Sequence, residues 1–226
     1  MAKQDDELLP FKTYSAGHLF FLAKQAYERT TGTKSDREPG KSDAIVAIVF
    51  AASSLEAFIN ELADWATEMP EIMKNPEIVQ SFASVMREVE DSRGSIRLKF
   101  MLTKLIFSGN TYKKDEQPFQ DLTLLFMVRD ALVHLKPQDE FKTAPDGQKV
   151  RVMTPKVLKA LPKNILAKFD ETVAADWKSM ISTQAVAKWA CNTAAKMVHS
   201  VIATLPESQF KKFAIDGFGI AFQPVK

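Results

Sequence analysis

The chain has 226 residues, of which 46% are hydrophobic and 26% are charged. These are ordinary globular values, and they exclude a disordered, collagen-like or disulfide-framework protein. The formal net charge of +2 argues against the strongly basic surface of a histone-like DNA-binding protein. With 8 Gly and 11 Pro, the chain holds fewer turn residues than a β-sandwich or β-propeller usually needs.

Apolar residues follow a helical spacing along almost the whole chain. We expect helices over residues 14–31, 42–68, 76–91, 95–107, 118–136, 155–170 and 174–204. The pattern predicts one all-α domain over residues 1–226, a bundle of about five to seven helices. The second, fifth and last of these segments are strongly helical, so we expect them to form the centre of the bundle.

Two segments depart from the helical spacing. Within residues 139–153, short runs flank Pro145-Asp146-Gly147, a sequence typical of a turn. We therefore expect a short β-hairpin there. Residues 216–226 show no periodicity and are expected to be irregular.

The composition gives little support for a metal site, a disulfide or a membrane-spanning segment. Cys191 has no partner for an intrachain disulfide and is expected to be a small buried hydrophobe on a helix. His18, His134 and His199 lie far apart, without the spacing of a metal site, so we expect no metal and no cofactor. The longest apolar run, residues 44–52, is too short to span a bilayer, and no secretory segment follows the polar N-terminus. We therefore expect a cytoplasmic protein without a membrane partner.

One cluster of residues near the end of the fifth segment suits phosphodiester chemistry. Arg129, Asp130 and His134 fall within six residues, and Asp130 and His134 share a helix face at a spacing of four. A carboxylate beside an imidazole fixes its tautomer and favours its protonated form. An arginine offsets phosphate charge while a histidine moves a proton. The alternative is structural: surface ion pairs, with His134 favoured at the negative end of the helix dipole.

Two further sets of residues are candidates for the same site. Glu56 and Asn60 are four apart on the second segment, so both could line a cleft or bond within the bundle. The region after His134 carries an excess of basic residues. A run of lysines and arginines can follow a polynucleotide backbone by displacing its counterions, although it is more often a solvated surface. The RNA-binding candidates in this run are Lys142, Lys149, Arg151 and Lys156.

The sequence resembles the HEPN superfamily (higher eukaryotes and prokaryotes nucleotide-binding) in two places. Residues 129–134, Arg-Asp-Ala-Leu-Val-His, resemble its R-x4-6-H motif at the end of an apolar helix. Residues 51–62, AASSLEAFINEL, resemble the Leu-Glu-x-Phe-x-Asn pattern on the long buried helix that precedes the motif in these proteins. The order of the two segments along the chain is also similar. One departure is Asp130, where the family often has Asn.

The resemblance implies a HEPN-like helical bundle and a metal-independent endoribonuclease of a toxin–antitoxin or other defence system. It implies a homodimer in which two motifs share one cleft, with RNA as substrate and an antitoxin as a further partner. Arg129 would stabilise the charge on the scissile phosphate, and His134 would act as acid or base, leaving a 2′,3′-cyclic phosphate. Asp130 would either weaken phosphate binding or make His134 more basic. The alternative is a non-catalytic HEPN module for dimerisation or for binding a nucleotide or partner protein.

Overall fold

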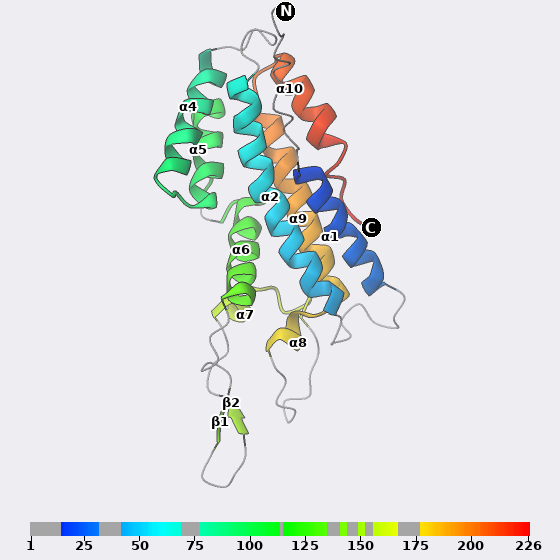
Figure 1. The fold of residues 1–226 in the computed structure, drawn as a ribbon. Helices are drawn as coiled ribbons and strands as arrows, with labels where there is room; N and C mark the ends of the chain where they lie inside the picture. Colours follow the sequence, from blue (N-terminus) through cyan, green and yellow to red (C-terminus); the bar gives the residue numbers. More distant parts are fainter. Residues whose placement is uncertain are drawn as a thin grey trace, which may run out of the picture.

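The computed structural model of the chain describes residues 15–31, 42–68, 77–113, 115–134, 141–143, 149–151, 156–166 and 177–226. Within these ranges it has nine α-helices, a π-helical turn and two short strands (Figure 1). The six long helices are α1 (Ala16–Thr30), α2 (Ser42–Glu68), α4 (Glu77–Asp91), α5 (Ile96–Ser108), α6 (Phe119–Val133) and α9 (Gln184–Thr204). The short helices are α7 (Lys156–Ala160), α8 (Trp177–Ile181), α10 (Gln209–Ala214) and the π-helix η1 (Ile215–Gly219). The prediction of an all-α bundle is confirmed. Helix α10 was not predicted, and of the helix expected over residues 155–170 the described part forms only α7, because residues 161–166 are not helical.

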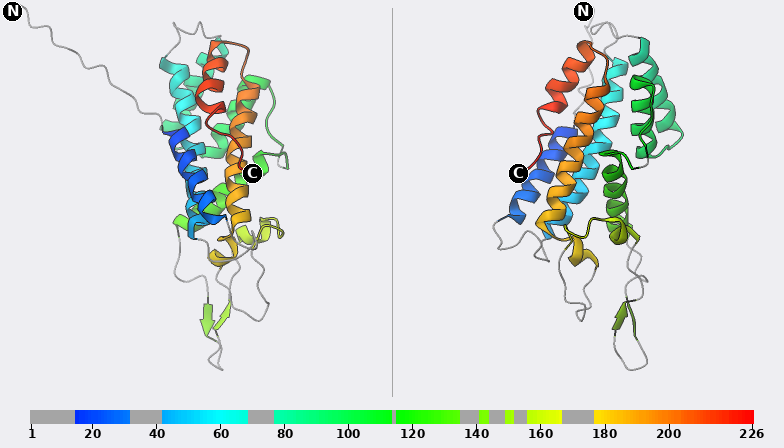
Figure 2. Two further views of the ribbon diagram at one scale, coloured as in Figure 1. Left: turned by 90° about the vertical axis from the view of Figure 1, so that its right-hand side faces the viewer. Right: turned by 180° about the vertical axis from the view of Figure 1, so that it is seen from behind.

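Helices α2 and α9 lie side by side along the middle of the bundle, and α1 packs against both (Figures 1 and 2). Helices α4 and α5 cover one edge of α2, while α6 lies against both α2 and α9. The expectation that the fifth segment, now α6, would be central was wrong. Its buried residues occupy the side toward α2 and α9, whereas α1 is the helix most extensively packed against α2.

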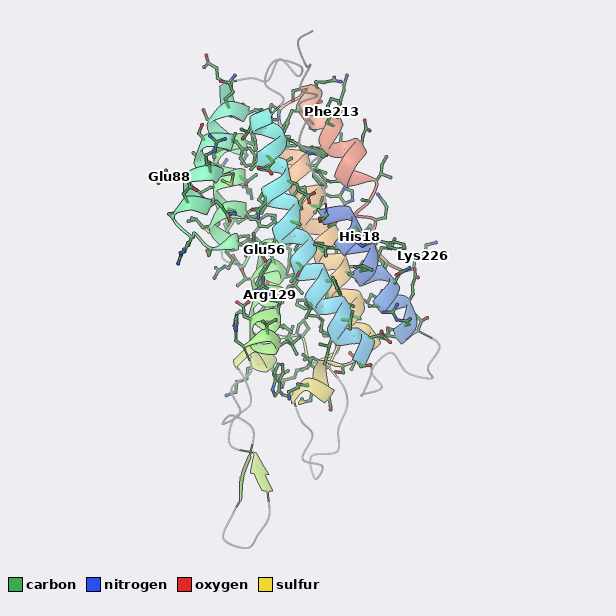
Figure 3. The ribbon with its side chains drawn as sticks, in the orientation of Figure 1. His18, Glu56, Glu88, Arg129, Phe213 and Lys226 are labelled. Atoms are coloured by element: carbon green, nitrogen blue, oxygen red, sulfur yellow. The ribbon has the colours of Figure 1, made fainter. Side chains whose placement is uncertain are left out.

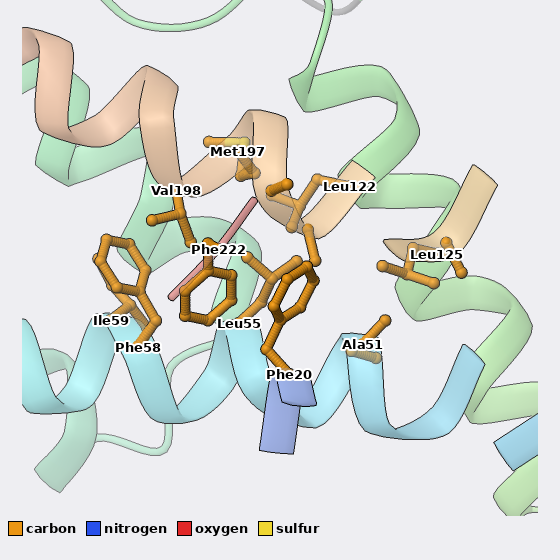
Figure 4. Close-up of a cluster of buried hydrophobic side chains, with 14 of the residues drawn as sticks. Phe20, Ala51, Leu55, Phe58, Ile59, Leu122, Leu125, Met197, Val198 and Phe222 are labelled. Atoms are coloured by element: carbon orange, nitrogen blue, oxygen red, sulfur yellow. The ribbon is translucent and has the colours of Figure 1, made fainter. Parts of the chain in front are cut away.

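The core joins residues from distant parts of the chain (Figure 4). Phe58 of α2 packs edge-on against Phe218, with 4.9 Å between ring centroids, and Phe20 of α1 stacks on Phe222 at 4.4 Å. All four rings are buried, and full burial of such a side chain contributes about 1.5–3 kcal/mol. The C-terminal segment is therefore part of the core.

That packing corrects the expectation for residues 216–226. The chain continues from α10 directly into η1 and does not become irregular until after it. Trp65 of α2 stacks on Phe218 at 4.4 Å and passes close to Gly217, where an added Cβ would lie 2.4 Å from the Trp65 ring. Glycine is needed at position 217 because the indole occupies the space that a side chain would take.

The predicted helix over residues 174–204 is interrupted. Helices α8 and α9 are separated at Ser182 and Thr183, and the Thr183 backbone is extended. The Thr183 hydroxyl accepts a hydrogen bond from the backbone N–H of Val186 at 3.1 Å, which caps the first turn of α9. A local side-chain cap therefore divides a segment whose apolar spacing continues across the break.

The first turn of α1 is capped from another helix. Ser15 forms no side-chain cap, and a carboxylate oxygen of Glu61 on α2 accepts hydrogen bonds from the backbone N–H groups of Ser15 and Ala16 at 2.5 and 2.9 Å. The second carboxylate oxygen of Glu61 is buried and has no hydrogen-bond partner among the residues that the structure describes. Burial raises the pKa of Glu61 from its ordinary value, although the two N–H groups act in the opposite direction.

Strands β1 (Phe141–Thr143) and β2 (Lys149–Arg151) pair antiparallel, with Phe141 opposite Arg151. They lie within the range in which a hairpin was expected, away from the helical bundle (Figure 1). In the sequence, these strands come after α6, the helix that carries the Arg129 motif.

Residues Ser42–Thr67 of α2 are long and apolar enough to cross a membrane by length and composition, with a mean hydropathy of 1.7. The expectation from residues 44–52 was therefore too narrow, because it counted an uninterrupted apolar run and not the average over the helix. Half of the apolar window is buried against the other helices. A core helix of a bundle passes the same test, so the feature is weak support for a membrane span.

Candidate functional site

Arg129 lies on α6 where this helix meets α2. Neighbouring positions on the inner side of α6, including Leu125, Phe126 and Val128, are buried, and they fix how the helix is rotated. The Arg129 guanidinium lies over the Phe126 ring, 5.5 Å from its centroid. Packing of the apolar side of α6 therefore places one charged side chain at the edge of the α2–α6 contact.

Two carboxylates hold the Arg129 guanidinium. One belongs to Glu56 of the neighbouring helix α2, which Figure 3 labels together with Arg129. Arg129 Nη2 donates to Glu56 Oε2 of α2 at 2.5 Å, and its Nη1 donates to Asp130 Oδ1 at 2.9 Å. The Arg129 side chain is 22% exposed, against 46% for Glu56 and 55% for Asp130. Partly exposed pairs of this kind contribute at most about 1 kcal/mol to stability. Their main consequence is that they orient the guanidinium.

His134 is the residue that ends α6. Its backbone N–H donates to the Asp130 carbonyl at 2.9 Å, and its φ of −105° and ψ of 46° leave the helical region. The His134 ring is exposed and makes no hydrogen bond to Asp130 or Arg129. The expected contact between Asp130 and His134 is not formed, because the Asp130 carboxylate turns to Arg129. An accessible imidazole thus lies at the C-terminal end of α6.

Asn60 does not join this group. Its Oδ1 accepts a hydrogen bond from Lys99 Nζ of α5 at 2.6 Å, and Lys99 also pairs with Glu90 of α4. One face of α2 meets α6 around Glu56 and meets α5 one turn further on (Figure 1). Of the two alternatives that the sequence left open for Glu56 and Asn60, the contacts favour bonding within the bundle: Glu56 contacts Arg129, and Asn60 contacts Lys99.

Sequence reasoning did not single out Lys99, which is 5% exposed. A signal was present, because Lys99 falls on the same stripe of α5 as Ile96, Phe100 and Thr103. A lysine on the inner face of an amphipathic helix needs a polar partner in the core. The structure supplies Asn60 and Glu90 beside a hollow of about 250 Å³ between α2 and α4.

The predicted RNA-binding residues are placed by their backbone alone. Lys142 lies on β1, Lys149 and Arg151 lie on β2, and Lys156 begins α7, but these four side chains lie outside the described ones. Helix α7 packs against α6. Helix α7, which begins with Lys156, therefore lies beside the helix that carries the Arg129 motif. No contact is assigned to the four basic side chains.

The described residues hold no group of three His, Cys, Asp or Glu side chains that could bind a metal ion. Cys191 is buried on α9, as expected, and burial raises the pKa of its thiol to about 12. A thiol with that pKa stays protonated near neutral pH, which disfavours Cys191 as a nucleophile. The chemistry available at the Arg129 site is consequently that of a guanidinium, two carboxylates and an imidazole.

No protein-family model, curated protein or solved structure matches the chain.

Proposed function

We propose that this protein is a metal-independent endoribonuclease with a HEPN-like fold. The observation that carries the proposal is the pairing of Arg129 with Glu56 beside the end of α6, where the exposed ring of His134 follows five residues later. The guanidinium supplies permanent positive charge for a phosphodiester, and an imidazole can both accept and donate a proton. Both groups belong to the motif that resembles the superfamily.

The reaction follows from these two groups. A base takes the proton of a ribose 2′-hydroxyl, the 2′-oxygen bonds to phosphorus, and the bond from phosphorus to the 5′-oxygen breaks. An acid then protonates the leaving 5′-oxygen, which leaves a 2′,3′-cyclic phosphate and a 5′-hydroxyl. His134 serves as base or acid, while Arg129 stabilises the charge that builds on the phosphate oxygens.

A homodimer completes this mechanism. One chain supplies one His134, whereas the reaction uses a base and an acid at the same time. A second chain with its α6 end in the same cleft supplies the second imidazole. We place this dimer in the cytoplasm as the toxic component of a defence system, held in check by an antitoxin protein.

A second function is favoured by the charges around Arg129. Glu56 and Asp130 both occupy the guanidinium, so a phosphate would have to displace at least one of them. That arrangement suits a non-catalytic HEPN module that dimerises and binds a nucleotide or partner protein. The two functions differ in whether purified protein turns over RNA.

The test is a cleavage assay on mixed single-stranded RNA in the presence of EDTA. Arg129→Ala and His134→Ala are compared with the matched surface changes Lys212→Ala and His18→Ala, which lie on α10 and α1. The proposal predicts EDTA-resistant cleavage that both site variants lose and both controls retain. Equal cleavage by all five proteins would reveal a contaminating nuclease. RNA binding without cleavage would support the module.

A further inference from the structure

Three polar side chains from three helices meet where α4 and α5 cover the edge of α2 (Figure 1). Lys99 of α5 donates from Nζ to Asn60 Oδ1 of α2 at 2.6 Å, and the same Nζ contacts a carboxylate oxygen of Glu90 on α4. The Lys99 side chain is 6% exposed, whereas that of Glu90 is 64% exposed. A primary amine, a side-chain amide and a carboxylate therefore share one position at the edge of the core.

This arrangement brings together the reactants of an amide exchange. The nitrogen of Lys99 is already in contact with the Asn60 amide that it would attack, and burial of the lysine stem holds it there. A lysine amine attacks a carbonyl carbon once a base has taken a proton from its ammonium. Glu90 is within reach to act as that base, because its carboxylate touches Nζ directly.

The nitrogen that such a reaction releases has a way out of the bundle. Asn60 Nδ2 makes no hydrogen bond within the part of the chain that the structure describes. Asn60, Glu90 and Lys99 all line a hollow of about 250 Å³. The exposed residues Glu90 and Arg87 belong to its wall, so the hollow reaches the surface. Ammonia, which is about as small as water, can leave through it without separating the helices.

We propose that Lys99 and Asn60 form an intramolecular amide (isopeptide) bond after the protein has folded. Glu90 takes one proton from the Lys99 ammonium, Nζ bonds to Cγ of Asn60, and the bond from Cγ to Nδ2 breaks. The proton on Glu90 and a second proton from Nζ pass to the departing nitrogen, which leaves as an ammonium ion. The charge is the same before and after the reaction. The hydrogen-bonded pair is the state before it, so freshly folded protein is held by the hydrogen bond alone.

The bond would join α2 to α5 across 39 residues of the chain. An amide C–N bond is about 1.33 Å long, so Nζ has to approach Cγ more closely than in the hydrogen bond. The flexible four-carbon stem of lysine allows this movement. A covalent link restricts the unfolded chain, as a disulfide does, so cross-linked protein should unfold at a higher urea concentration. The proposal is independent of Arg129 and His134 and does not rest on the ribonuclease proposal.

The experiment is intact-mass spectrometry of the wild-type protein, freshly purified and during a week of incubation. A species lighter by one ammonia molecule is expected to accumulate until it predominates. Trypsin should then give a branched peptide that joins residues 42–74 to residues 98–104, without cleavage after Lys99. Glu90→Gln should slow the reaction about a hundredfold. Glu88→Gln, at an exposed position on the same helix, is the matched control and should leave the rate unchanged (Figure 3).

Lys99→Arg separates the cross-link from another loss of ammonia, in which an asparagine side chain closes a ring with its own backbone. Arginine keeps the positive charge but offers no amine nucleophile, so its mass should stay unchanged. The proposal is overturned if Lys99→Arg loses ammonia as the wild type does, or if Glu90→Gln and Glu88→Gln react at equal rates. A wild-type mass that stays constant over the week would also overturn it, and that result does not depend on the folding of any variant.

Discussion

Glu56 and Arg129 lie 73 positions apart in the sequence and form an ion pair of 2.5 Å between α2 and α6. The pair joins the two segments whose sequences resemble the HEPN superfamily. Its geometry determines where the guanidinium points, and the site's chemistry depends on that direction.

Glu56→Gln tests this positioning role. The amide keeps a weaker hydrogen bond to Arg129, so the guanidinium becomes less well oriented for the transition state. We expect kcat for RNA cleavage to fall about tenfold with little change in KM. The free energy of unfolding should change by less than about 1 kcal/mol, because both side chains are partly exposed.

Glu207→Gln is the control, since Glu207 also pairs with a basic residue, Lys211, but lies at the surface and far from Arg129 in the sequence. Its kcat should equal that of the wild type. Equal losses in the two variants would remove the special role of Glu56.

Asp130→Asn should have the opposite effect. The change removes a negative charge that occupies Nη1 of Arg129, and it leaves the Glu56 contact in place. We expect RNA to bind severalfold more tightly at low salt, with a smaller gain at high salt because exposed charges are screened. Fluorescence anisotropy with labelled RNA, measured in the His134→Ala background, gives the affinity without cleavage. Weaker binding would mean that Asp130 assists the site.

Lys99→Met tests the hydrogen bond that the buried Lys99 donates to Asn60. Methionine keeps the apolar stem but leaves the Asn60 oxygen without its ammonium donor, so we expect a loss of roughly 1–3 kcal/mol in unfolding free energy. Adding Asn60→Leu should recover part of that loss, because both polar partners are then replaced. Urea denaturation of Lys99→Met, Asn60→Leu and the double variant measures these effects. A double variant whose losses simply add would show that the pair is not coupled.

Gly217→Ala should destabilise the fold by about 1–3 kcal/mol, because the new methyl group would have to move the Trp65 ring away from Phe218. Gly219→Ala is the control in the same π-helix, where the nearest atoms to an added Cβ are 3.8 Å away. Thermal unfolding of both variants compares them directly. Equal melting temperatures would show that Trp65 adjusts without strain.

The raised pKa of Glu61 predicts that the free energy of unfolding depends on pH. Burial raises its pKa in the folded state above the ordinary value of 4.5, so the folded protein holds this proton more tightly than the unfolded chain. The contribution of Glu61 to stability is therefore largest below about pH 4.5 and is lost as the pH rises through the raised pKa. Relative to Glu61→Gln, the wild type should become less stable between about pH 4.5 and 7, as measured by urea denaturation. A constant difference over that range would contradict the raised pKa.

The long helices were predictable because their apolar spacing and their buried faces coincide, as in α1, α2, α4 and α5. The break at Thr183 was missed because the apolar spacing continues across it, and only the hydroxyl cap reveals it. The order of the C-terminal segment was missed because it depends on Trp65, which lies about 150 residues earlier.

The candidate site, too, was predictable from the sequence only in part. The grouping of Arg129, Asp130 and His134 is local and was visible in the sequence. The contact of Arg129 with Glu56 joins positions 73 apart in the sequence, so local spacing does not contain it. Asn60 contacts Lys99 because α5 meets α2 one helical turn beyond Glu56. Helical periodicity in the sequence does not predict where along α2 that contact falls.

The chemical ends of RNA fragments give the most direct test of the central claim, that Arg129 and His134 perform metal-independent transfer to the 2′-oxygen. Wild-type and His134→Ala proteins are incubated with a defined oligoribonucleotide in EDTA, and the fragments are analysed by mass spectrometry. The account predicts 2′,3′-cyclic phosphate and 5′-hydroxyl ends from the wild type and intact RNA from His134→Ala. Fragments that carry 3′-hydroxyl and 5′-phosphate ends, or identical fragments from both proteins, would contradict it.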